Sequence, residues 1–260
     1  MKTIFVSFFL ALIFPGQYIW AEEQYACDER IVNTVGEHFE LDHFFTREGF
    51  NDDGKLIGAG MCKPFPQNRQ WVIAAFGYDT GNEDDVYGLP EKYLLLSVVD
   101  ISKNRVIASY QRSILEDGTT DFSVGSIRLD TGRYNLSSTT RAFGVRLFTF
   151  QGSKAMDGGM ENDLTLFIME GSALKPVLSQ TMRYWSYGVD RTHGINYDDM
   201  LETKIVISVE PTSTKGFADL RFIARRSDHK SVSAVVKYNG ESYDMTPFRN
   251  VFVDWWSLRD

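Results

Sequence analysis

The sequence predicts a mainly β protein, most simply an antiparallel β-sandwich with a short N-terminal helix. Short apolar runs recur from Trp71 onward, and turn-forming residues separate them. Several successive runs are related as hairpins, most clearly around Asn239-Gly240, the dipeptide that favours tight hairpin turns. Since helical periodicity does not intervene, neighbouring strands are expected to be antiparallel. An irregular, propeller-like stack of hairpins is the alternative.

Residues 1–21 have the features of a cleavable secretory signal peptide. Lys2 gives a positive start, residues 4–14 are apolar, and Ala21 offers a small residue for cleavage. The apolar run is shorter than the roughly 18–20 residues that a membrane helix needs, and no later run reaches that length. We therefore expect an exported, soluble protein that is periplasmic or secreted and has no membrane anchor.

Residues 22–70 are predicted to contain a helix and an irregular region. Apolar residues recur at helical spacing within 27–43, whereas 44–70 is rich in glycine and proline. Cys27 and Cys62 are the two cysteines of the chain. In an oxidising compartment an even pair of cysteines predicts a disulfide, which would tie this region together.

Residues 71–260 are predicted to form one all-β domain. The expected strands cover residues 71–76, 93–100, 105–110, 164–169, 174–178, 204–209, 217–222, 233–238 and 241–245. Near the C-terminus, the strand-forming residues 251–253 precede Trp255-Trp256, and we expect a packed end strand there.

The charge of the chain argues against two classes of partner. The sequence has 27 basic and 35 acidic residues, a formal net charge of −8. Nucleic-acid binding requires a basic face, and so does adhesion to anionic lipid. We therefore expect no nucleic-acid partner.

The densest acidic stretch contains Asp79, Asn82, Asp84 and Asp85. Clustered oxygen ligands beside a glycine can hold calcium, but the spacing differs from that of an EF-hand loop. Asparagine and aspartate are also common in solvated turns. We interpret the stretch as such a turn without a cofactor, with calcium as the alternative.

The most aromatic segment is the best candidate for ligand binding. Tyr184, Trp185 and Tyr187 lead into a polar stretch that contains Asp190 and His193. Aromatic rings beside polar groups suit a saccharide or a protein partner. The rings also fit an ordinary strand, which is the structural alternative.

A second polar cluster combines Asp130 with Arg133, Arg141 and Arg146. We interpret it as an ion-paired network at a strand edge, with a clamp for a carboxylate or phosphate as the alternative. The runs 127–134, 141–146 and 163–167 resemble uncharacterised secreted proteins of Gram-negative bacteria. This resemblance implies a periplasmic or exported location and carries no established activity.

Two functional hypotheses follow from these features. The first is a non-enzymatic binding or structural protein whose partner is an unknown protein or a saccharide, because neither a Gly-x-Ser-x-Gly nor a His-Glu-x-x-His motif occurs. The second is a secreted hydrolase or carbohydrate-active enzyme that uses Asp190, Asp198 and Asp199 beside the aromatic segment.

Overall fold

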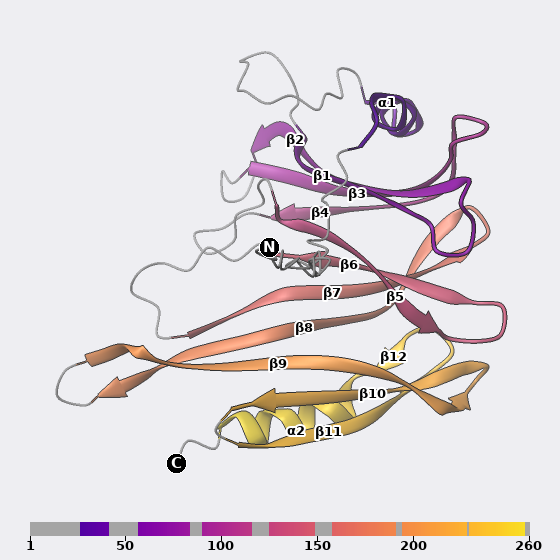
Figure 1. Ribbon diagram of the computed structural model, residues 1–260. Helices are drawn as coiled ribbons and strands as arrows, with labels where there is room; N and C mark the ends of the chain where they lie inside the picture. The colour runs from indigo at the N-terminus through magenta and orange to yellow at the C-terminus, as the bar shows by residue number, and fades with distance from the viewer. Residues whose placement is uncertain are drawn as a thin grey trace, which may run out of the picture.

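A computed structural model of the chain describes residues 27–41, 57–83, 90–115, 125–148, 158–190, 194–227 and 229–257. Within these ranges the chain forms twelve strands and two helices (Figure 1). In chain order the elements are α1 (Glu29–His38), β1 (Ile57–Pro64), β2 (Trp71–Glu83), β3 (Pro90–Asp100), β4 (Arg105–Leu115), β5 (Ile127–Asn135), β6 (Arg141–Leu147), β7 (Gly158–Glu170), β8 (Ala173–Asp190), β9 (Gly194–Thr214), β10 (Phe217–Arg226), β11 (His229–Tyr238), β12 (Tyr243–Asp244) and α2 (Thr246–Ser257).

Most strands pair antiparallel with the strand that follows them in the sequence. One meander runs from β1 to β4 and a second from β5 to β12. The two meet where β4 runs parallel to the start of β8, with Ser109 opposite Ala173. The predicted mainly β, antiparallel fold with a short N-terminal helix is confirmed.

The first core lies where β1–β4 face β5–β7, two parts of one twelve-stranded sheet. Ile73 of β2 and Leu96 of β3 meet Leu129, Val145 and Phe167 from the opposing strands in one buried cluster. Apolar side chains on one face of each strand create this core, since removing such surface from water is the main favourable term in folding.

The second core lies between the other face of β7 and α2. Leu166 of β7 joins Phe222 of β10 and Phe248 of α2 in this cluster, whereas the adjacent Phe167 belongs to the first core. β7 is therefore buried on both faces. This part of the second meander thus lies between the β1–β4 layer and α2, with one core on each side (Figure 1).

The helix α1 begins at a clear capping residue. Asp28 accepts a hydrogen bond from the backbone N–H of Arg30 at 2.9 Å, and this satisfies a donor that the first turn leaves without a partner. Val32 and Val35 are buried against β2 and β3. The prediction of a helix within 27–43 is confirmed for its central part, residues 29–38.

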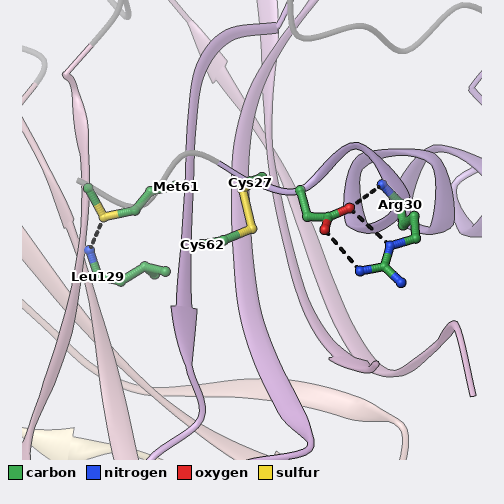
Figure 2. Close-up of a disulfide and its surroundings, with 6 residues drawn as sticks. Cys27, Arg30, Met61, Cys62 and Leu129 are labelled. Atoms are coloured by element: carbon green, nitrogen blue, oxygen red, sulfur yellow. Dashed lines mark hydrogen bonds and ion pairs between the residues drawn. A yellow bond between two sulfur atoms is a disulfide. The ribbon is translucent and has the colours of Figure 1, made fainter. Parts of the chain in front are cut away.

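The predicted disulfide between Cys27 and Cys62 is present. It joins the residue before the N-cap of α1 to β1, with the two Cα atoms 5.0 Å apart (Figure 2). The bridge therefore attaches α1 covalently to the edge strand beneath it.

The strand β1 lies where we expected irregular structure, and that expectation is wrong for residues 57–64. Its backbone pairs with β2, for example Cys62 with Ala74. Leu129 of β5 holds it from the other side, because its N–H donates to Met61 Sδ at 3.1 Å (Figure 2) and its carbonyl accepts from Lys63 Nζ at 3.3 Å. Tertiary pairing thus overrides the low strand propensity of the local glycines.

The C-terminal segment is a helix, so the prediction of an end strand over residues 251–253 is wrong. Phe248, Phe252 and Trp255 are all buried, and their spacing of four and three residues places them on one helical face. Pro247 occupies the first turn, where its missing N–H costs nothing. Neither helix in the described residues is long and apolar enough to span a membrane.

Candidate binding groove

A groove of about 880 Å³ lies between α2 and the β7–β8 pair. This volume falls in the usual range for small-molecule sites. Its lining residues are Gly158, Gly159, Met160, Asp163, Ser179, Gln180, Thr181, Tyr184, Trp185, Ser186, Phe248, Arg249, Phe252, Val253 and Trp256.

The sheet forms one wall of the groove. Gly158 lies opposite Ser186, and Met160 lies opposite Tyr184, so the side chains of Ser186, Met160 and Tyr184 lie on one face of the sheet. A Cβ atom added to Gly158 would come within 2.9 Å of the Trp185 carbonyl oxygen. Glycine at this position therefore allows the strands to approach closely beside the groove.

The helix forms the opposite wall with aromatic rings. The rings of Phe252 and Trp256 are nearly parallel, with centroids 6.2 Å apart, and Tyr184 lies 4.8 Å from Phe252. The guanidinium of Arg226 lies 5.5 Å from the Trp256 ring centroid. These contacts fix α2 against the sheet.

Polar groups are placed beside the aromatic ones. Gln180 Nε2 donates to the Tyr184 hydroxyl at 3.2 Å, and the Thr181 hydroxyl donates to Asp163 at 2.6 Å. Burial raises the pKa of Tyr184, so its phenol remains neutral at physiological pH. The groove therefore combines apolar walls with a few oriented polar groups, as ligand sites commonly do.

The sequence-predicted binding residues are only partly brought together. Tyr184 and Trp185 line the groove, whereas Tyr187 packs edge-to-face on Trp185 with centroids 5.4 Å apart. Asp190 ends β8, but its side chain lies outside the described residues, as does the whole of His193.

Sequence reasoning missed the contribution of α2. Phe248, Arg249, Phe252, Val253 and Trp256 all line the groove. Their spacing follows a helical period, which could have identified this face. The strand-forming residues 251–253 within this segment favoured an end strand instead.

The acidic stretch proposed for calcium cannot be placed in full. Asp79 and Asn82 belong to β2 by their backbone, and their side chains lie outside the described part of the chain, as do Asp84 and Asp85. Among the side chains that are described, no three His, Cys, Asp or Glu residues are grouped as metal ligands.

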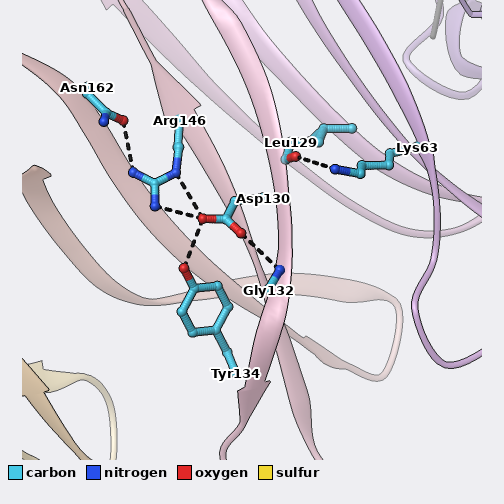
Figure 3. Close-up of polar contacts among 7 residues, drawn as sticks. All are labelled: Lys63, Leu129, Asp130, Gly132, Tyr134, Arg146 and Asn162. Atoms are coloured by element: carbon cyan, nitrogen blue, oxygen red, sulfur yellow. Dashed lines mark hydrogen bonds and ion pairs between the residues drawn. The ribbon is translucent and has the colours of Figure 1, made fainter. Parts of the chain in front are cut away.

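The interpretation of the Asp130 cluster as an ion-paired network is confirmed for Arg146 but not for Arg133 or Arg141 (Figure 3). Arg146 Nη2 lies 2.7 Å from the Asp130 carboxylate, which also accepts from the Tyr134 hydroxyl and the Gly132 N–H, both at 2.9 Å. Arg141 donates instead to backbone carbonyls on β5, and Arg133 is exposed. The cluster therefore braces the β5–β6 pair.

The network also shifts two pKa values. Burial raises the pKa of Asp130, but the charge of Arg146 and the hydrogen bonds outweigh it, so the pKa lies below its usual range. Burial, together with the neighbouring Asp130 charge, raises the pKa of Tyr134 to about 12. Both residues thus keep the protonation states that the network requires at neutral pH.

Alkaline pH is expected to destabilise the protein through Tyr134. In the unfolded chain its phenol loses a proton above about pH 10, whereas the folded phenol keeps it up to about 12. Within this window the free energy of unfolding should fall by about 1.4 kcal/mol per pH unit for this residue. Urea unfolding of the wild type and Tyr134→Phe at several pH values measures the difference.

The substitution should cost about 1 kcal/mol at neutral pH through the lost hydrogen bond, and it should remove this alkaline loss. The comparison isolates Tyr134 because burial also raises the pKa of Tyr243, which is present in both proteins. Identical pH dependence in both proteins would contradict the assignment.

A scan against protein-family models finds no match to the chain. Searches of curated proteins and of solved structures find no match either.

Proposed function

We propose that the chain is an exported, non-enzymatic binding protein whose ligand site is the groove between β7–β8 and α2. The observation that carries this proposal is the groove itself, where aromatic residues from two distant parts of the chain share one concave surface. The disulfide supports export, since such bridges persist in oxidising compartments.

The hydrolase hypothesis has less support from the groove. A glycosidase needs two carboxylates on either side of the scissile bond. Among the described residues of the lining, one is acidic, Asp163. Asp198 and Asp199 are exposed on β9 and do not belong to the lining. We therefore prefer binding to catalysis.

A neutral apolar dye, N-phenyl-naphthylamine, tests the groove as a ligand site. We expect saturable fluorescence enhancement with the wild-type protein. Val253→Asp, which places a charge in the lining, should weaken this binding by about tenfold. Val251→Asp is the matched control, because Val251 is exposed on the same helix but outside the lining. A lack of saturable binding, or equal effects of the two variants, would refute the groove as the site.

A further inference from the structure

An arginine lies at the groove, and no described residue holds it in a hydrogen bond or ion pair through its side chain. Arg249 belongs to the lining and is exposed. Among the described residues, no hydrogen bond or ion pair holds its guanidinium, whereas Arg146, Arg183 and Arg221 each pair with a carboxylate. A guanidinium presents five donors in a planar fork, a geometry that matches an anionic group of a ligand.

The carboxylates around Arg249 accept their hydrogen bonds from other residues, while the hydrogen bonds from Thr246 and, to a smaller extent, the charge of Arg249 lower the pKa of Asp244. Asp163 accepts from the Thr181 hydroxyl, and Asp244 accepts from the Thr246 N–H at 3.0 Å. Besides burial, the charge of Asp163 raises the pKa of the Tyr184 phenol, and the charge of Arg249 lowers it. An arriving anion would thus be attracted by Arg249 and repelled by Asp163. The two residues should therefore have opposite effects on the affinity for an anionic ligand.

The groove also exposes apolar side chains on both walls. Met160 on the sheet side is 60% exposed, and Val253 on the helix side is 62% exposed. Both belong to the lining of the same groove. Covering apolar surface yields about 25 cal/mol per Å², so a ligand with an apolar body gains most by lying between these residues.

A saccharide fits this arrangement less well than a chain-like apolar ligand. Sugar binding commonly uses an open aromatic ring face, but the two tryptophans of the lining already contact other groups. Trp256 packs against Phe252 and Arg226, and Trp185 packs against Tyr187. The exposed surface between the walls is instead contributed by the aliphatic side chains of Met160 and Val253.

We infer that the groove binds a free single-chain amphipathic anion, of the long-chain carboxylate class. Its apolar chain would lie between Met160 and Val253, and its anionic group would pair with Arg249. This inference rests on the proposed binding function and adds the chemistry of the ligand. The overall charge of −8 does not favour anions, so the preference depends on the local cation.

Two dyes with the same apolar skeleton distinguish the contribution of an anionic group to binding from that of the apolar contact. Anilinonaphthalene sulfonate carries an anionic group, and N-phenyl-naphthylamine carries none. Arg249→Gln should weaken binding of the anionic dye by about fivefold and leave the neutral dye unchanged. Asp163→Asn should strengthen binding of the anionic dye by about twofold. A purely structural disturbance would weaken both dyes.

Arg225→Gln is the matched control. It removes the same charge from an exposed position on β10, outside the groove, and should leave both dyes unaffected. Displacement of the anionic dye then ranks three ligands that share one chain, with dodecanoate expected to compete better than dodecanol and dodecyltrimethylammonium. Sedimentation with phosphatidylglycerol vesicles distinguishes a free anion from a lipid surface.

Each outcome decides between the two proposals. If the neutral dye binds but Arg249→Gln does not change the affinity for the anionic dye, the anion preference is wrong and the binding function stands. Stronger competition by the trimethylammonium ligand, or sedimentation with vesicles that dodecanoate does not prevent, would also overturn it. If neither dye binds the wild type, the binding function itself fails.

Discussion

Loss of the Cys27–Cys62 disulfide is expected to lower the free energy of unfolding by about 4 kcal/mol. The two cysteines are 35 residues apart in the sequence, so the bridge restricts the unfolded chain substantially. In the folded state it joins α1 to β1, where Cys62 is buried in the cluster that contains Val32 and Val35. Urea unfolding of the wild type and of the Cys27→Ser/Cys62→Ser variant measures the loss.

The double variant also provides the control for reductant. Its stability should be the same with and without dithiothreitol, whereas the wild type should fall to a similar level when reduced. If the proposed export includes cleavage after Ala21, the intact mass should be that of residues 22–260, and reduction should add two hydrogens. An unchanged free energy of unfolding in the double variant would contradict the proposed contribution of the bridge.

Phe248→Ala is expected to lower the free energy of unfolding by about 3–5 kcal/mol. Phe248 is fully buried, at 0% exposed. Its ring lies 5.3 Å from that of Phe222 on β10 and 5.5 Å from that of Phe252 on α2. Removal of the ring leaves a cavity at the point where α2 meets the sheet, so the helix loses both apolar contact and close packing.

Val251→Ala provides the comparison, because Val251 lies on the exposed side of the same helix. Its effect should remain within about 0.5 kcal/mol. Denaturant midpoints of the two variants, at equal slopes, give the difference. Similar costs for both substitutions would show that α2 does not pack as described.

The strand content follows from local sequence, whereas the C-terminal helix does not. Hairpin patterns such as that around Asn239-Gly240 encode pairing between neighbours, and Tyr238 does pair with Tyr243 across that turn. Residues 251–253 favour a strand by composition, but burial of Phe248 and Phe252 on one face decides for a helix. The competing term is tertiary contact, which propensity does not include.

The groove, too, depends on tertiary contacts that local sequence does not reveal. Tyr184 and Trp185 could be identified as an aromatic segment, but Val253 and Trp256 reach them only because α2 crosses the second core beside β8. The pairing of Arg146 with Asp130 was easier to predict, because β5 and β6 are adjacent strands. Sequence proximity therefore predicts contacts within a meander better than contacts across a core.

The order of the strands has a consequence for the sequence in which parts of the fold can form. Within each meander, successive strands pair with each other, so each hairpin can form outward from its own turn. The parallel pair of Ser109 with Ala173 is the sheet contact that spans a long separation. We therefore expect each meander to form from its own hairpins, with the parallel pair joining the two meanders last.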